Sequence, residues 1–199
     1  MKKEFSFYEF VGILVPSAIL LFLVNLIISF NYGIKIIDFN EIGETTIFII
    51  ICYGFGHILQ AIGNIFESII WFLYGGMPTN WLTKKNRFNN FLFETDFNQK
   101  VLDKTKLKFG DGIKDYGRIT YNFLFIKEKT NRIDLFNGNY SLLRGLAVSF
   151  LVIVIIIPFY FSLIYVLYAL IPFLLATLRM IRFAKYYATE IFRTFFNYE

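Results

Sequence analysis

GLAVSFLVIVIIIPFYFSLIYVLYALIPFLLATL, residues 145–178, is the longest apolar run of the sequence, with 34 residues and no charged side chain. As one helix it would extend roughly 51 Å at about 1.5 Å per residue, whereas the hydrocarbon core of a bilayer is about 30 Å thick. The run is therefore either one strongly tilted helix or two shorter spans. We expect two spans, at about 143–158 and 161–181, joined by a tight turn near Pro158–Ser162.

Two further apolar runs precede this one. Phe10–Phe30 holds 21 residues without a charge, which gives roughly 31 Å of helix and is enough to cross the core. The second run extends from Thr46 to Tyr74, and we place its span at about 46–67. With 56% hydrophobic residues and a mean hydropathy of +0.54, the chain is more apolar than soluble domains, which hold about 45–50%. The sequence therefore predicts an all-α membrane protein with four transmembrane helices.

The start of the chain does not favour a cleaved signal peptide. Met1-Lys2-Lys3 is followed by Glu4 and Glu9, where such a peptide needs a basic region. The apolar run that follows is also longer than the usual stretch of about 7–15 residues. We therefore expect the first run to remain as a span.

Charge asymmetry between the connections predicts how the spans are oriented. Connection 31–45 carries one basic and three acidic residues, whereas segment 75–142 carries 12 Lys or Arg against 7 Asp or Glu, and the tail 179–199 carries four against two. Because basic flanks stay in the cytoplasm, segment 75–142 and the tail should share that side, which requires an even number of crossings between them. We expect four spans in the plasma (inner) membrane with both termini cytoplasmic. Three spans with the tail outside is the alternative.

The expected organisation has four parts. These are a two-span membrane unit at 1–74, a small and mainly helical cytoplasmic region at 75–142, the membrane hairpin at 143–181, and an amphipathic C-terminal helix at 182–199. Within the cytoplasmic region, residues 119–126 suit either a helix or a strand.

The C-terminal helix gathers basic and polar side chains on one arc and apolar side chains, such as Ala184, Ile191 and Phe195, on the other. This pattern suits two places equally well. The helix can lie on the inner leaflet with its basic residues near anionic lipid, or it can pack against segment 75–142.

The second apolar run is the one that is not uniformly apolar. At about 100° per residue its polar side chains fall within one arc of about 80°, and two glycines, Gly56 and Gly63, flank that arc. Unsatisfied polar groups in hydrocarbon cost several kcal/mol, so this polar stripe must face protein or water. The polar stripe consists of Tyr53, His57, Gln60, Asn64 and Glu67.

Two interpretations of the polar stripe stay open. In one, the glycines allow close helix approach and the polar side chains hydrogen-bond across a helix interface. In the other, the stripes of several subunits meet around an axis and line a pore or a ligand cavity, since a functional site is the default hypothesis for ionisable residues inside a membrane. If the span covers 46–66, His57 lies near the midplane of the bilayer and Glu67 at its inner boundary.

The residue types also limit the chemistry that the chain can perform. A lone cysteine, Cys52, and a lone histidine, His57, exclude an intrachain disulfide and any multi-cysteine or multi-histidine metal site. No nucleotide-binding or hydrolase motif is present, so we expect no enzyme activity, cofactor or metal. The loops of membrane proteins that face the cytoplasm are basic in any case, so the basic segment does not lead us to expect direct nucleic-acid binding.

Five basic residues are expected at the membrane interface, and Arg144 is expected to reach the headgroups. The five are Arg144, Arg179, Arg182, Lys185 and Arg193.

Several short patterns connect the sequence to small bacterial multi-pass proteins. They are Tyr8-Glu9-Phe10 with Gly12 and Pro16 in the first span, Gly56-His57-x-x-Gln60 in the second, and Arg182, Tyr186-Tyr187 and Phe192-Arg193 in the tail. In these patterns and in general architecture the chain resembles membrane subunits of antiphage systems, such as the Kiwa membrane subunit and the Hailong channel-like effector. The resemblance implies a homo-oligomeric membrane sensor or effector that works with a cytoplasmic partner.

Our leading expectation is a homo-oligomeric, channel-like membrane effector, a tetramer being one such arrangement. The polar stripe would line or gate the pathway, and segment 75–142 would receive a signal from a partner protein or a nucleotide-type ligand. One alternative is a non-conducting scaffold or sensor that holds a soluble protein at the membrane. A further alternative is a membrane enzyme acting on lipid, with His57 and Glu67 as acid and base.

Overall fold

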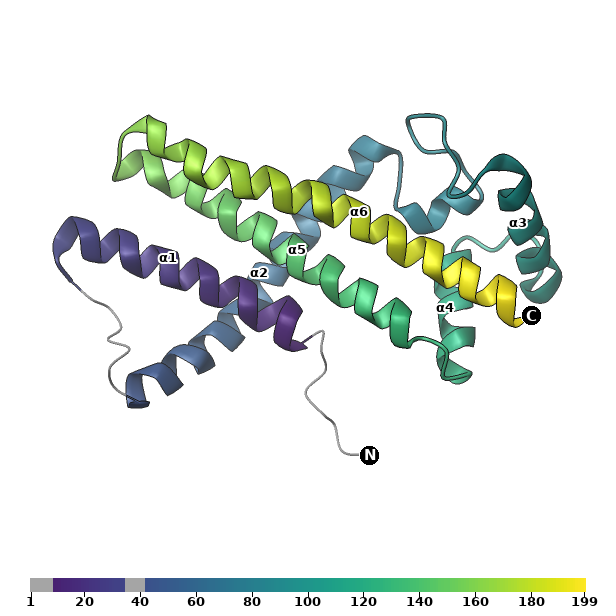
Figure 1. Ribbon diagram of the computed structural model, residues 1–199, viewed down its shortest axis with the longest axis horizontal. Coiled ribbons are helices and arrows are strands. Elements are labelled where there is room, and N and C mark those ends of the chain that lie inside the picture. The colour runs from purple at the N-terminus through teal and green to yellow at the C-terminus, as the bar shows by residue number, and fades with distance from the viewer. Residues whose placement is uncertain (1–8, 35–41) are drawn as a thin grey trace. The chain divides into compact units, whose positions relative to one another are not determined.

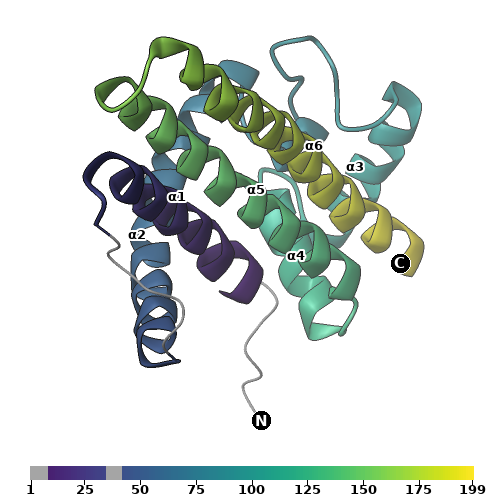
Figure 2. The same ribbon diagram turned by 60° about the vertical axis from the view of Figure 1, so that its left-hand side comes forward.

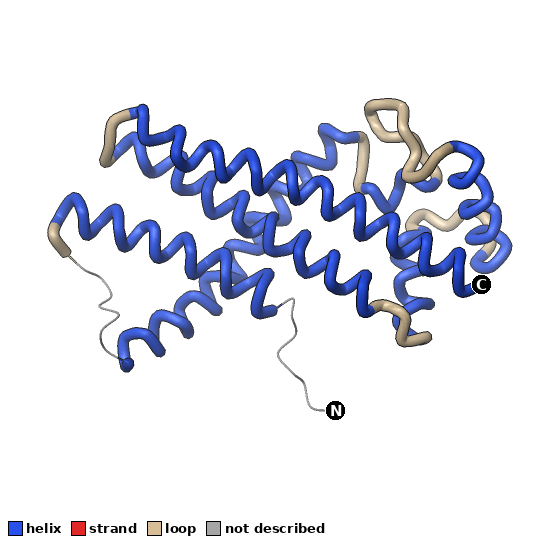
Figure 3. The backbone as a smooth tube through the Cα atoms, in the orientation of Figure 1, coloured by secondary structure: helices blue, strands red, loops and turns tan. Residues whose placement is uncertain are grey.

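The computed structural model describes residues 9–34 and 42–199. Within these ranges the chain is built from helices and loops without a strand (Figure 3). Short turns of other helix types are η1 (Glu9–Leu14), a π-helix, and η2 (Pro78–Leu82), η3 (Ile157–Phe159) and η4 (Leu163–Tyr165), which are 3-10 helices. The α-helices are α1 (Val15–Tyr32), α2 (Ile42–Tyr74), α3 (Thr95–Phe109), α4 (Tyr116–Ile126), α5 (Asn131–Ile156) and α6 (Val166–Tyr198).

Four helical stretches of the described residues are long and apolar enough to cross a membrane. They are Phe10–Tyr32, Gly43–Leu82, Asn131–Phe159 and Leu163–Tyr198. This confirms the prediction of an all-helical protein with four helices of spanning length, and it supports a multi-pass membrane protein. Residues 35–41 of connection 31–45, which carry three of its four charged side chains, lie outside the described residues, as does the start of the chain that a signal peptide would occupy.

The longest apolar run folds as two helices and not as one. α5 ends at Ile156 and α6 begins at Val166, with η3 and η4 between them (Figure 1). Pro158 explains the break, because a proline disfavours helical backbone in the residue before it. The backbone N–H groups of Tyr160 and Phe161 both donate to the carbonyl oxygen of Ile157, at 3.0 and 2.9 Å, and close the turn.

The chain divides into two compact units. The first combines Met1–Phe66 with Gly138–Met180, and the second combines Glu67–Asn137 with Ile181–Glu199. The expected parts therefore group in pairs: the two-span N-terminal part joins the hairpin, and the cytoplasmic region joins the C-terminal helix. That last helix is not a separate element, because α6 continues without a break from the hairpin to Tyr198.

The first unit is a helical bundle with its core between α1, α2 and α5. α1 lies beside α5, and α2 crosses them obliquely (Figures 1 and 2). Leu20, Leu59 and Val148, one from each helix, are at most 3% exposed. At the far end of α1 the Phe30 ring contacts the Phe161 ring of the hairpin turn, with 5.6 Å between centroids, so the end of α1 packs against that turn.

The second unit has a core of aromatic side chains from α3, α4 and the end of α6. The Phe195 ring contacts those of Phe109 and Phe123, with centroids 5.4 and 5.9 Å apart. Lys104 Nζ donates to the Phe196 carbonyl oxygen at 2.9 Å. The apolar arc of the C-terminal helix therefore packs on segment 75–142, which is the second of its two expected places. The ambiguous stretch 119–126 is part of helix α4.

A hydrogen bond between α4 and α5 gives the second unit a pH-dependent contribution to stability. The Tyr121 hydroxyl donates to Asp134 Oδ1 at 2.7 Å. Burial of the ring, followed by the hydrogen bond and charge of Asp134, raises the pKa of Tyr121 above its usual range. Protonated Tyr121 is therefore favoured more in the folded protein than in the unfolded chain.

We expect Tyr121→Phe to lower the free energy of unfolding by about 1–2 kcal/mol at neutral pH. Because folding raises this pKa above the unfolded value of about 10, the contribution is complete below that pH and is lost as the pH rises further. The difference between the variant and the parent should therefore shrink above about pH 10, as measured by denaturant unfolding in detergent. Tyr186→Phe, which keeps its ring contacts with Phe136 and Phe183, is the control. A difference that stays constant with pH would contradict this account.

Candidate functional site

A buried polar cluster joins three helical segments of the first unit, with Gln60 of α2 at its centre. Gln60 Nε2 donates to the Gly12 carbonyl oxygen and, at 3.2 Å, to Ser141 Oγ, while Gln60 Oε1 accepts from Arg144 Nη2. Gln60 and Arg144 are each only 8% exposed. These four residues form what we call the Gln60 cluster.

The sequence of the first span explains why a side chain reaches the backbone here. Pro16 has no N–H and cannot donate to the carbonyl group of Gly12, four residues earlier. Gln60 supplies a donor to that carbonyl group. Two serines make similar bonds nearby, since Ser17 Oγ donates to the Cys52 carbonyl oxygen at 2.6 Å and Ser149 Oγ donates to that of Pro16 at 3.0 Å.

Glycines allow the helices to approach closely enough for these bonds. A Cβ atom at Gly56 would lie 2.5 Å from the Ile13 carbonyl oxygen, and one at Gly145 would lie 2.6 Å from Pro16 Cγ. At Gly63 a Cβ atom would lie 3.4 Å from Arg144 Cγ. Gly56 therefore holds α2 against the start of the first span, and Gly63 faces α5.

The structure divides the polar stripe between different surfaces. Gln60 points into the helix interface, whereas His57 and Asn64 are exposed and Tyr53 is half-buried. The Tyr53 and His57 rings meet edge to face, with 5.0 Å between centroids. Glu67 is half-buried in the second unit and lines a groove there. The helix-interface interpretation therefore suits Gln60, whereas His57 and Asn64 form a separate exposed edge of α2, next to the half-buried Tyr53.

Contacts between the first two spans show where His57 lies along the bundle. Gly56 lies against Ile13, and Gln60 bonds to Gly12. Ile13 is three residues from the beginning of the Phe10–Tyr32 stretch, or about 5 Å at about 1.5 Å per residue. His57 is therefore level with the beginning of the first span. Its position near the midplane of the bilayer stays a prediction.

The expected interfacial basic residues also separate into two groups. Arg144 does not reach outward as expected: its guanidinium group bonds to Gln60 and lies over the Tyr140 ring, 5.8 Å from the centroid. The reason is that Gly63 leaves room for its side chain beside α2. The other four side chains are exposed on α6: Arg179, Arg182, Lys185 and Arg193.

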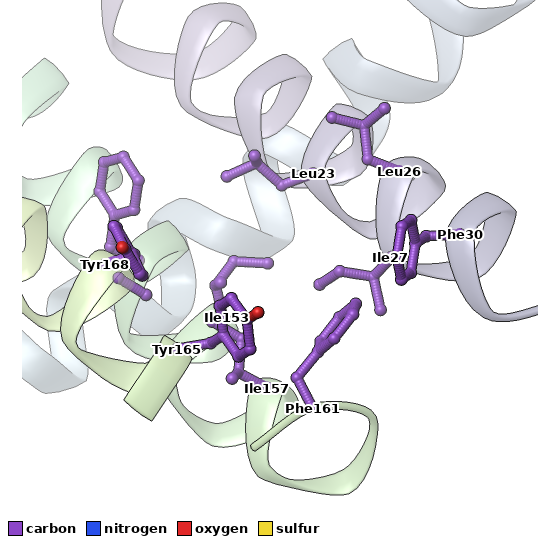
Figure 4. Close-up of a pocket in the computed structure, with 11 residues that line it drawn as sticks. Leu23, Leu26, Ile27, Phe30, Ile153, Ile157, Phe161, Tyr165 and Tyr168 are labelled. Atoms are coloured by element: carbon purple, nitrogen blue, oxygen red, sulfur yellow. The ribbon is translucent and has the colours of Figure 1, made fainter. Parts of the chain in front are cut away.

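An apolar groove of about 640 Å³ opens between the first span and the hairpin turn. Leu23, Ile27 and Phe30 line one wall, and Phe161 and Tyr165 lie on the other (Figure 4). Sequence reasoning missed this groove, because its walls are more than 100 positions apart in the chain. Its only polar groups are the hydroxyls of Tyr165 and Tyr168 and backbone atoms, so it suits a hydrocarbon chain and offers no acid–base pair.

Sequence reasoning also missed Gly12, Ser17, Ser141 and Ser149 as partners of the polar cluster. The one available signal was Pro16, which predicts a carbonyl group without its usual donor four residues earlier. Within 9–34 and 42–199, no group of three or more His, Cys, Asp and Glu side chains is placed to hold a metal ion.

Comparison with protein-family models, with curated proteins and with solved structures finds no match for this chain. The class therefore rests on the fold: four helices of the described residues are long and apolar enough to cross a membrane, which supports a multi-pass membrane protein. Its distinguishing features are the Gln60 cluster and the exposed edge of α2.

Proposed function

We propose that the protein is a homo-oligomeric, channel-like membrane effector in which the exposed edge of α2 faces the same edge of neighbouring copies. The observation that carries this proposal is the exposure of His57 and Asn64 on a helix long and apolar enough to cross a membrane. An ionisable side chain such as that of His57 is costly to place against hydrocarbon. This side of α2 is therefore stabilised by protein or water in preference to lipid.

The same side of α2 continues into an apolar part. Ile50 lies within about 20° of His57 on the helix circumference, and its side chain is 66% exposed. In an oligomer, His57 and Asn64 would line a wet vestibule, and the Ile50 side chains would form an apolar constriction. Such constrictions close a pathway by excluding water, so the exposed edge holds both a vestibule and a gate.

The second unit is the part suited to receive a signal. It holds 15 Lys or Arg against 10 Asp or Glu, so it carries the whole net charge of +5. α2 runs without a break from Ile42 into this unit. Binding of an anionic ligand or an acidic partner protein there would act on the same helix that carries the gate.

Cysteine crosslinking in membranes tests the subunit arrangement. Cys52 is the only cysteine of the sequence and is fully buried, so Cys52→Ala provides a background for single introduced cysteines. His57→Cys is expected to form disulfide-linked dimers. Ile62→Cys is the control, since Ile62 is 42% exposed but lies about 140° around the helix from His57. Equal crosslinking at both positions, or none at either, would refute the arrangement.

Ion flux into liposomes tests conduction itself. Ile50→Ser is expected to raise the flux, because a hydroxyl group at the constriction favours water there. Ile62→Ser should leave the flux unchanged, and Asn64→Leu should lower it. If neither the parent protein nor Ile50→Ser passes ions, the channel proposal fails.

A non-conducting scaffold is the second candidate. It is favoured by apolar side chains at the surface of the second unit, where Leu107, Phe125 and Ile126 are 90%, 62% and 77% exposed. Such side chains suit a docked protein partner. The scaffold predicts crosslinking without flux, together with loss of partner binding in Leu107→Ser.

A further inference from the structure

The C-terminal end of α2 and the loop after it form an exposed apolar surface in the second unit. Phe72 and Phe88 are 77% and 62% exposed, and Ile69 and Leu73 are also exposed. The Phe88 ring contacts that of Tyr74, with 5.4 Å between centroids. Apolar side chains from the helix and from the loop therefore lie next to one another.

The glycine turn after α2 brings basic residues to the same surface. Gly75 and Gly76 have φ values of 80° and 117°, which side chains other than glycine rarely adopt. The chain then returns, so that the Arg87 N–H donates to the Tyr74 carbonyl oxygen at 3.0 Å and Arg87 Nη1 donates to that of Leu73 at 3.4 Å. Asn86 Oδ1 holds the loop by accepting from the N–H groups of Phe88 and Asn90.

The charge of this surface has a single sign. Residues 68–93 contain Lys84, Lys85 and Arg87 and no acidic residue. All three basic side chains are exposed. The surface therefore combines aromatic and aliphatic side chains with three cations, directly at the end of a helix of membrane-spanning length.

A groove of about 540 Å³ borders this surface on α2. Trp71, Phe72 and Met77 give it apolar walls, and its one acidic residue, Glu67, lies at the opposite end from the glycine turn along α2. The groove therefore offers space for part of a hydrocarbon chain beside Arg87, whose backbone nitrogen would lie 3.0 Å from a Cβ atom at Gly75. Lys84 and Lys85 precede Arg87 in the same loop. Cations and an apolar groove side by side match the two halves of a phospholipid.

We propose that the end of α2 and the loop 83–90 form a binding site for anionic phospholipid, which we call the α2 collar. Lys84, Lys85 and Arg87 bind the phosphate of the headgroup, while Phe72 and Phe88 enter the interfacial layer, where aromatic side chains are enriched. Basic residues close to a membrane each contribute about 1 kcal/mol towards anionic lipid, or about fivefold in affinity. This site does not depend on whether the protein conducts ions.

The two tryptophans of the sequence provide a local probe of the α2 collar. Trp71 and Trp81 lie in this part of the second unit, with 6.4 Å between ring centroids. Fluorescence quenching by brominated lipid therefore reports on lipid bound here. The full chain would be reconstituted in phosphatidylcholine vesicles, and brominated phosphatidylglycerol would be compared with brominated phosphatidylcholine as the quencher.

The parent protein is expected to prefer phosphatidylglycerol by at least about fivefold. Lys84→Gln/Lys85→Gln/Arg87→Gln should remove the preference, and Lys84→Gln/Lys85→Gln, which keeps the Arg87 bonds to the end of α2, should remove most of it. Lys100→Gln/Lys114→Gln/Arg118→Gln is the matched control, because it removes the same charge from exposed positions of the same unit. An unchanged preference in both collar variants would overturn the proposal, as would an equal loss in the control.

Discussion

Replacing Gly56 by alanine is expected to lower the free energy of unfolding by about 1–3 kcal/mol. The added Cβ atom would lie 2.5 Å from the carbonyl oxygen of Ile13 and 2.6 Å from Ile13 Cγ2. The carbonyl oxygen is a backbone atom and cannot move unless the start of the first span moves with it. The helices must therefore separate, which also lengthens the bond from Gln60 to Gly12. Thermal or denaturant unfolding of the purified protein in detergent measures the effect.

Gly54 provides the matched control on the same helix. It is exposed, and no atom lies within 4 Å of a Cβ built there. Because alanine favours a helix over glycine by about 0.8–1 kcal/mol, Gly54→Ala should be neutral or stabilising. Equal destabilisation by both substitutions would show that the effect of Gly56→Ala comes from the helix backbone and not from contact with Ile13.

Gln60→Leu is expected to lower the free energy of unfolding by about 2–4 kcal/mol. The variant removes the amide donor to Gly12 and Ser141, and it also removes the acceptor for Arg144. The guanidinium group would stay buried without this charge-assisted bond, and such bonds contribute more than those between neutral groups. Unfolding in detergent is again the measurement.

A double-mutant cycle separates the loss of the Arg144 bond from a packing defect. Arg144→Met removes the buried charge but keeps an apolar side chain of similar length. If Gln60 and Arg144 are coupled, Gln60→Leu/Arg144→Met should be more stable than the sum of the two single effects implies. Strictly additive effects would show that the bond contributes little.

The helices and the hairpin could be predicted because length and charge constrain them directly. A charge-free run of 34 residues is too long for one perpendicular span, and Pro158 lies at a position that lets the run break. These signals are local in sequence. They need no knowledge of which helix lies beside which.

The partners of the polar stripe could not be predicted, because they come from distant positions. Gln60 and Arg144 are 84 positions apart, and nothing near Arg144 distinguishes a buried arginine from one that reaches the headgroups. Helical spacing placed Gln60 and His57 on one arc, but only the position of α1 and α5 shows that the arc is divided between a buried and an exposed surface.

The position of the C-terminal helix could not be predicted for a different reason. Its alanine, isoleucine and phenylalanine side chains can be buried equally well against lipid or against protein, so the composition of this arc suits both places. The structure decides because Phe109 and Phe123 meet Phe195. Those two phenylalanines lie in segments whose helices the sequence predicted only loosely.

The place where α2 is held has a mechanical consequence. Gln60 lies near the middle of the 33 residues of α2, roughly 27 Å from Ile42 and 21 Å from Tyr74 at about 1.5 Å per residue. Gly12, Ser141 and Arg144 hold the helix there, and Ser17 holds it again at the Cys52 carbonyl oxygen, about 12 Å along the same helix. Two points of attachment fix the direction of a helix as well as its position, so this part of α2 cannot tilt against the first span without breaking one of them.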